Sequence, residues 1–288
     1  MGKVFKALSK STADADNEQP DVQVERQAEF VPEVERESSE VKVEPEEQEI
    51  IKESSPGNWD ERLATLTGNY PDVLESFRRL RTKIIHPAEG MPARSILVVS
   101  ATPVEGKSFV CANLGGIMAQ GLDQHALIVD CDLRRPSMAR LFGQDNDKGL
   151  VNYLRDGVKL SSLIVQTGLK RLTLIPAGPP PGNPSELLSS ARMTAMIDEV
   201  VNRYQDRFIL LDSPPVQAAS ETAVLAQHVD GVILVVRWGG PGREQVKQLV
   251  DQIGREKIIS VVFNAFEMTI LDVGMKKEGY YKYYAEQY

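Results

Sequence analysis

Short apolar runs rich in Val, Ile and Leu recur along the chain after residue 94, each separated from the next by a stretch long enough for a helix. The runs are SILVVSA, ALIVDCD, LTLIPA, FILLDS, GVILVVR and IISVVFN. Continuous apolar runs are typical of parallel strands that are buried on both faces. The pattern therefore predicts an α/β fold with a doubly wound, mostly parallel sheet, and a functional site beyond the carboxyl ends of its strands.

Residues 11–57 have a different pattern, rich in Glu, Ser, Gln and Pro. They hold fifteen acidic and four basic residues, a net charge of -11, and the first ten residues carry +3, so the total of -8 leaves about zero for residues 58–288. Because this composition buries too little apolar surface to offset the entropy of ordering, a disordered linker is predicted. Val4, Phe5 and Leu8 fit one face of a short docking helix, and fit a frayed terminus equally well.

Composition also excludes several classes of protein. No concentrated basic face is present, so a nucleic-acid partner is not expected. Cys111 and Cys131 fall inside apolar runs and form no disulfide framework, which indicates a reducing compartment. No apolar run approaches the roughly 20 residues that cross a bilayer. We therefore expect a cytoplasmic protein that reaches the membrane through a partner.

The first apolar run leads into ATPVEGKS, which fits a phosphate-binding loop with Ala101 in place of the first Gly. In such a loop, backbone N–H groups surround phosphates, the lysine reaches the terminal phosphates and the serine binds Mg²⁺. A helix is predicted from Lys107 to Gly121, with its positive end at the anion. The loop residues assigned to ATP are Pro103, Val104, Glu105, Gly106, Lys107, Ser108 and Phe109.

Carboxylates follow two further strands. Asp130 and Asp132 end the second run and, two residues apart, are expected to project from the same side of an extended strand. Paired carboxylates repel unless a cation offsets them, and a magnesium nucleotide with Arg134 would supply that charge. A solvated strand end is the alternative. Asp212 ends the run FILLD and is typical of a Mg²⁺-binding carboxylate on a central strand.

Together these segments resemble a known family. ATPVEGKS, LIVDCDLRRP and FILLDSPP are similar to the Walker A, Walker A′ and Walker B motifs of the bacterial tyrosine kinases of capsule and exopolysaccharide synthesis, over roughly residues 70–288. ESFRRLR matches the E-x-x-R-x-x-R signature of that family at Glu75, Arg78 and Arg81. The tail MKKEGYYKYYAEQY resembles the family's autophosphorylation cluster, at Tyr280, Tyr281, Tyr283, Tyr284 and Tyr288.

The resemblance implies a P-loop NTPase fold of the partitioning-ATPase-like superfamily and an ATP- and Mg²⁺-dependent protein-tyrosine autokinase. It makes Asp130 the base or orienting group for the tyrosine hydroxyl, with Lys107 stabilising the transferred phosphoryl group. Ser108 and Asp212 would hold Mg²⁺, with Asp132 acting directly or through water. Arg134 would neutralise the Asp pair or contact phosphate. Asn264 resembles an adenine-binding residue, although a strand cap explains it nearly as well.

The same resemblance implies an organisation in three parts: an N-terminal peptide and linker (1–57), a kinase domain (58–275) and a tyrosine-rich tail (276–288). Glu75, Arg78 and Arg81 would pair across subunits of a ring, so that one subunit's tail enters its neighbour's site. A separate membrane-embedded polysaccharide chain-length regulator is expected as the activator, and a cognate tyrosine phosphatase is a candidate partner. The kinase would then regulate polysaccharide synthesis and export at the inner face of the membrane.

Two other functions remain open from the sequence. A partitioning-type ATPase switch would carry a signature lysine five residues before Lys107, where this chain has Thr102. A non-catalytic assembly factor would bind nucleotide only as a control element. The presence of the full set of motif residues argues for chemistry instead: Lys107, Ser108, Asp130, Asp132 and Asp212. A tyrosine tail that merely packs as a strand or against a partner is the alternative to a phosphorylated tail. The turn-rich segment AGPPPGNPSELLSS receives no role.

Overall fold

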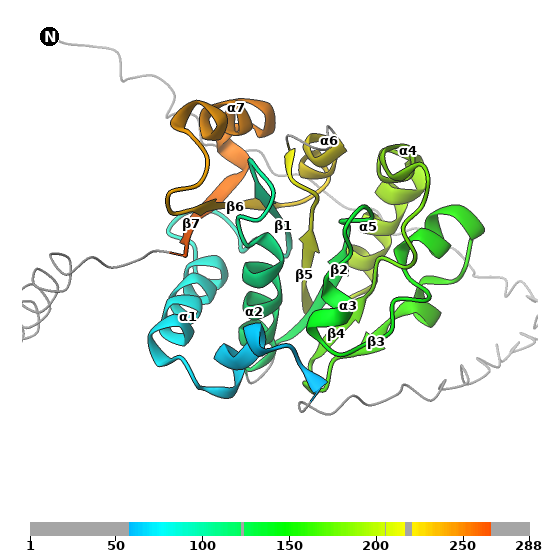
Figure 1. The fold of residues 1–288 in the computed structure, drawn as a ribbon, viewed down its shortest axis with the longest axis horizontal. Coiled ribbons are helices and arrows are strands. Elements are labelled where there is room, and N and C mark those ends of the chain that lie inside the picture. The colour runs from blue at the N-terminus through cyan, green and yellow to red at the C-terminus, as the bar shows by residue number, and fades with distance from the viewer. Residues whose placement is uncertain (1–57, 122–123, 205, 217–220, 266–288) are drawn as a thin grey trace, which may run out of the picture. The chain divides into compact units, whose positions relative to one another are not determined.

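The computed structural model describes residues 58–265, apart from 122–123, 205 and 217–220 (Figure 1). Within these residues seven strands form one sheet in the order β3-β4-β2-β5-β1-β6-β7. The strands are β1 (Ser95–Ser100), β2 (His125–Asp130), β3 (Val165–Gln166), β4 (Leu172–Ile175), β5 (Arg207–Asp212), β6 (Gly231–Arg237) and β7 (Ile258–Asn264). All neighbours pair in parallel except β3 with β4. The predicted mostly parallel sheet is confirmed, and the two-residue β3 is too short to leave a pattern in the sequence.

Strand β1 lies in the middle of the sheet, between β5 and β6, and all of its residues are buried. Its Val98 is aligned with Asp212 of β5, which is in turn aligned with Asp130 of β2. The carboxyl ends of three neighbouring strands therefore meet at one edge of the sheet. This is where parallel α/β folds bind their ligands.

Helices cover both faces of the sheet, and two separate hydrophobic clusters form the core (Figure 1). One cluster includes buried side chains from η2 (Glu61–Thr67), α1 (Pro71–Ile85), α2 (Lys107–Ala119) and α3 (Met138–Leu141). The other includes side chains from α4 (Pro184–Leu188), α5 (Ala191–Arg203), α6 (Glu221–Gln227) and α7 (Arg243–Ile253). The described residues also include the short helical segments η3 (Asn152–Asp156), η4 (Leu160–Leu163) and η6 (Arg255–Lys257).

The helix after the phosphate loop is buried almost all round, because it packs between the sheet and the η2 and α1 segments. A Cβ atom on its Gly115 would lie 2.7 Å from Ile128 Cδ1, so a small residue is needed where α2 approaches β2. The helix ends at Ala119, two residues before the predicted end at Gly121. The close fit of α2 on the sheet fixes its first residue, Lys107, at the sheet edge.

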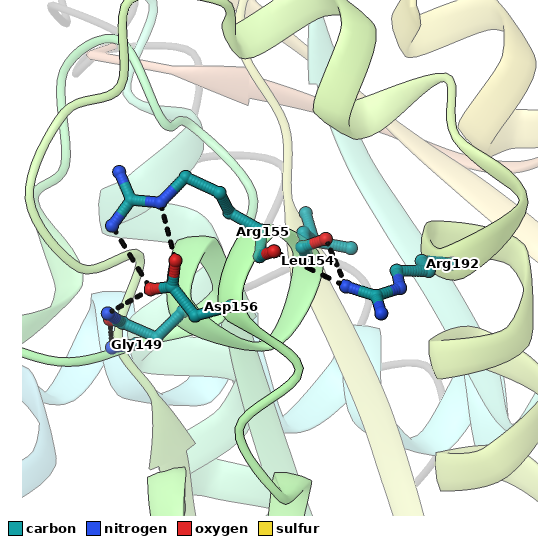
Figure 2. A network of polar contacts seen from close by, with 6 residues as sticks. Gly149, Leu154, Arg155, Asp156 and Arg192 are labelled. Atoms are coloured by element: carbon teal, nitrogen blue, oxygen red, sulfur yellow. Dashed lines mark hydrogen bonds and ion pairs between the residues drawn. The ribbon is translucent and has the colours of Figure 1, made fainter.

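A polar network holds the segment after α3 against α5 (Figure 2). The Nη1 atom of Arg192, on α5, donates to the Leu154 carbonyl oxygen at 3.0 Å and so satisfies a carbonyl at the end of η3. Arg155 and Asp156 form an exposed ion pair at 2.7 Å, and the Gly149 N–H donates to Asn152 Oδ1 at 2.9 Å. Exposed ion pairs stabilise little, so the contacts to backbone groups contribute more to holding this segment than the ion pair does.

Several expectations concern residues outside the described ranges. These are the N-terminal peptide and linker within 1–57, and the tail tyrosines Tyr280, Tyr281, Tyr283, Tyr284 and Tyr288. The three-part domain organisation therefore stays a prediction. In the described part of the chain, no helix has the length and apolar character needed to cross a membrane.

Candidate active site

The phosphate loop connects the buried end of β1 to the start of α2. Two residues of the loop have left-handed backbone angles: Gly106 with φ 92° and Val104 with φ 65°. Gly106 needs this freedom because an L residue is strained there. Pro103 and Val104 are exposed at the loop tip, whereas Lys107 is 6% exposed. The loop thus leads directly into a helix N-terminus whose first side chain is a buried lysine, an arrangement suited to binding phosphate.

Glu105 points into the loop. Its Oε1 atom accepts hydrogen bonds from the Thr102 N–H at 2.5 Å and the Thr102 hydroxyl at 2.9 Å. Its Oε2 atom accepts from the Arg237 N–H, at the end of β6, at 3.1 Å. Because the carboxylate is buried and takes three donors, it holds the loop in shape and ties it to the neighbouring strand.

Asn264, at the end of β7, contacts the same loop. Its Nδ2 atom donates to the Glu105 carbonyl oxygen at 2.9 Å. A Cβ atom on Gly106 would lie only 1.9 Å from this Nδ2 atom. The sequence allowed Asn264 to be an adenine-binding residue or a strand cap. In the structure its side chain contacts the phosphate loop.

Asp130 and Asp212 lie opposite each other at the ends of β2 and β5, and both are fully buried. Burial and the nearby Asp212 charge raise the pKa of Asp130 to about 8. Burial also raises the pKa of Asp212, to about 6, although Lys107 and the Ser108 hydroxyl act in the opposite direction. Two buried carboxylates on aligned residues of neighbouring strands cannot both ionise easily without a cation.

The oxygens of these carboxylates have different partners. Asp130 Oδ2 accepts from the Ser137 N–H at 3.0 Å and the Met138 N–H at 2.9 Å, and its Oδ1 accepts from the Asp132 N–H at 3.2 Å. Asp212 Oδ2 accepts from the Ser108 hydroxyl at 2.6 Å. Asp212 Oδ1 is buried and has no hydrogen-bond partner among the described residues.

Asp132 departs from the expected geometry. Strand β2 ends at Asp130, so Asp132 lies in the following loop and does not share a strand face with it. Its Oδ1 atom accepts from the Arg135 N–H at 3.1 Å, and burial raises its pKa while the Lys107 charge opposes that rise. The expectation that Asp130 and Asp132 project from the same side of one strand was therefore wrong. The opposed pair is Asp130 and Asp212, on neighbouring strands.

Arg134, in the same loop, is directed to two residues that the sequence did not single out. Its Nη2 atom donates to the Ser185 hydroxyl at 2.6 Å and lies 3.3 Å from Oε1 of Glu221. An acidic residue at the start of a helix shortly after FILLDSPP was the available signal for Glu221. Only the tertiary structure shows that Glu221 is paired with Arg134.

The site suits a magnesium nucleotide. The unpartnered Asp212 oxygen, beside the Ser108 hydroxyl, is a hard oxygen donor of the kind that Mg²⁺ prefers. In the described residues no group of three or more His, Cys, Asp and Glu side chains is arranged to hold a metal ion. Mg²⁺ is usually bound through one or two carboxylates together with substrate phosphates. The residues present therefore fit a metal that arrives with ATP.

The remaining predicted residues lie nearby or on α1. Phe109 packs its ring against Phe77 of α1, with 6.0 Å between ring centroids. On α1, Glu75 and Arg78 are exposed and only 3.8 Å apart at their closest polar atoms. Arg81 instead donates from Nη1 to the Ile117 carbonyl oxygen of α2 at 3.0 Å. Of the three signature residues, Arg81 is thus committed to a contact within the subunit.

The fold and the loop define a P-loop nucleotide-binding protein. No family model matches the chain. CapB of Staphylococcus aureus, which is described as a tyrosine-protein kinase, is 30% identical to this chain over 217 residues. The match covers 74% of this chain and 91% of CapB. The chain belongs to the bacterial tyrosine-protein kinase family, as its motifs predicted.

Two further comparisons agree. EpsB of Ralstonia nicotianae, also described as a tyrosine-protein kinase, is 34% identical over 215 residues, but these make up 73% of this chain and only 28% of EpsB. The solved kinase domain of the Escherichia coli tyrosine kinase ETK matches with a TM-score of 0.65 and 28% identity, covering 74% of this chain and 84% of that structure. The chain thus spans most of CapB but under a third of EpsB.

Proposed function

We propose that this chain is an ATP-dependent protein-tyrosine kinase that phosphorylates tyrosines of its own tail. The observation that carries the proposal is the meeting of Lys107 and Ser108 with Asp130 and Asp212 at one edge of the sheet. Phosphoryl transfer needs positioning and charge stabilisation more than covalent participation by the protein, and this set of residues supplies both.

The reaction forms a bond between the tyrosine phenolic oxygen and the γ-phosphorus of ATP, and breaks the bond from that phosphorus to the oxygen that leaves with ADP. Asp130 accepts or orients the phenolic proton. Lys107 and the loop N–H groups stabilise negative charge on the transferred group. Ser108 and Asp212, with Asp132 nearby, would hold Mg²⁺, which would supply positive charge to stabilise the phosphates.

The acceptor residues are Tyr280, Tyr281, Tyr283, Tyr284 and Tyr288. Transfer in trans within a ring is supported by the exposure of Glu75 and Arg78, which leaves these side chains available to a neighbouring subunit. Phosphates on the tail would each add roughly -1.5 to -2 charges and loosen its docking. We further propose that phosphorylation of the tail regulates exopolysaccharide or capsule synthesis, with a membrane-embedded activator and a cognate phosphatase as partners.

A partitioning-type ATPase switch is disfavoured by a specific contact. Thr102 occupies the place of the signature lysine, and both its N–H and its hydroxyl are bound by Glu105. This position therefore carries a neutral side chain that is already bound within the loop.

The experiment incubates full-length protein with Mg²⁺ and ATP, alone and with candidate activator segments, and maps phosphate by mass spectrometry. We expect phosphotyrosine in residues 280–288 that is absent from Lys107→Met. A tail that remains unmodified under every condition, while ATP is hydrolysed, would overturn the proposal in favour of the switch.

A further inference from the structure

The segment AGPPPGNPSELLSS, which had no role from the sequence, contributes a side chain to the Walker A′ loop. Ser185 lies in the first turn of α4, and its hydroxyl accepts a hydrogen bond from Arg134 Nη2 at 2.6 Å. The same hydroxyl donates to Glu221 Oε1 at 3.1 Å, and Arg134 Nη2 lies 3.3 Å from that oxygen. The three side chains form a closed triangle, which we call the Arg134 latch.

Glu221 is more deeply buried in the latch than Arg134. Its side chain is 1% exposed, whereas that of Arg134 is 40% exposed. A buried carboxylate is costly unless it is paired and hydrogen-bonded, and among the described residues Arg134 and Ser185 supply partners for Glu221 Oε1. The buried acid therefore determines where the half-exposed guanidinium lies.

The latch joins three segments that follow strands at the site edge, one loop and the first turns of two helices. Arg134 follows β2 by four residues, Ser185 is in the helix that follows β4, and Glu221 begins the helix that follows β5. These are the strands that carry Asp130 and Asp212 or lie beside them. The phosphate chemistry described above uses neither Ser185 nor Glu221, so the polar contacts of the buried Glu221 with Ser185 and Arg134 call for another explanation.

The guanidinium retains donors beyond those in the latch. Among the described residues, Nε and Nη1 of Arg134 have no hydrogen-bond partner, while Nη2 carries both latch contacts. Because a guanidinium is planar and rigid, fixing one nitrogen restricts the directions of the others. Such a fork matches the geometry of phosphate oxygens.

We propose that Ser185 and Glu221 are positioning residues of the kinase. They hold Arg134 so that its remaining N–H donors bind a phosphoryl oxygen during transfer to tyrosine. This inference rests on the proposed tyrosine kinase function. It adds two residues, from segments outside the three Walker motifs, whose effect on the reaction passes through Arg134.

The test measures initial rates of tail phosphorylation against ATP concentration, in full-length protein, for Ser185→Ala, Glu221→Gln, Arg134→Gln and the Glu221→Gln/Arg134→Gln double variant. We expect each single change to lower kcat by about tenfold while KM for ATP changes by less than about threefold, since the contact acts during transfer. The double variant should be no slower than Arg134→Gln alone.

Two controls separate positioning from folding. Glu186→Gln changes the exposed neighbour of Ser185 and should retain the wild-type kcat. Ser185→Thr keeps the hydroxyl and should recover most of the rate lost in Ser185→Ala, with equal thermal unfolding midpoints for the two variants.

The latch would be overturned if the losses of kcat in Glu221→Gln and Arg134→Gln multiply in the double variant, or if Ser185→Ala and Glu221→Gln retain the wild-type kcat. Either result would leave the kinase proposal intact. A wild-type protein that never modifies its tail would overturn the proposed function and the latch together.

Discussion

Asp130 and Asp212 are aligned residues of the neighbouring parallel strands β2 and β5, and both carboxyl groups are fully buried. One Asp212 oxygen binds the Ser108 hydroxyl, and the other lacks a partner among the described residues. The folded protein therefore holds two acids together at the point where a phosphate-bound cation would be received. This arrangement lowers stability without the ligand and favours binding of a cation.

The first prediction concerns stability without Mg²⁺ or nucleotide. The pKa values of Asp130 and Asp212 in the fold, about 8 and about 6, lie above the ordinary value for Asp. At pH values between the ordinary and the raised pKa, the folded state therefore binds more protons than the unfolded state. The free energy of unfolding should then fall as pH rises from about 5 to about 8. In urea unfolding with EDTA, Asp212→Asn should lose about 1–2 kcal/mol less than wild type over this range. Parallel pH profiles for the two proteins would contradict the account.

The second prediction concerns Glu105. Its carboxylate accepts three hydrogen bonds, and a Gln amide at this position would set an NH₂ group against one of the donors. Glu105→Gln should weaken binding of a non-hydrolysable ATP analogue by about tenfold, measured by calorimetry, because the loop loses its shape. Exposed Glu89→Gln serves as the charge-matched control, and equal Kd values for the two variants would refute the role of Glu105.

The third prediction separates contact from backbone strain at Gly106. Gly106→Ala introduces a Cβ against Asn264 and places an L residue at φ 92°, so nucleotide binding should be lost or weakened by more than about tenfold. Adding Asn264→Ala removes the contact but not the strain, and should restore part of the affinity. If the double variant binds no better than Gly106→Ala, the Asn264 contact is not the cause.

The fourth prediction divides the roles of the two signature arginines on α1. Arg81 bonds to the Ile117 carbonyl oxygen inside the subunit, so Arg81→Ala should lower the free energy of unfolding by about 1–2 kcal/mol. Arg78 is exposed, and Arg78→Ala should change stability by less than about 0.5 kcal/mol while reducing the oligomer mass in light scattering. A ring that survives Arg78→Ala would remove this residue from the proposed interface.

Local patterns in the sequence were enough to predict the parallel strands, the phosphate loop and the family, because buried strands and glycine-containing loops leave short-range signals. Long-range relationships could not be predicted in this way. The alignment of Asp130 with Asp212 depends on the order in which strands enter the sheet. The bond between Arg134 and Glu221 joins residues 87 positions apart. Asp132 was misplaced because β2 ends two residues before it, and strand ends are not marked by alternation alone.

In the proposed reaction, phosphate from ATP passes to tyrosine and not to water. The most direct measurement follows a single sample of full-length protein with Mg²⁺ and labelled ATP, in the presence of an activator segment, and quantifies label in residues 280–288 and label released as free phosphate. We expect label in the tail from the earliest times, abolished by Lys107→Met and by replacing the five tail tyrosines with Phe. Free phosphate as the only labelled product, at the same rate with and without those tyrosines, would contradict the proposed reaction.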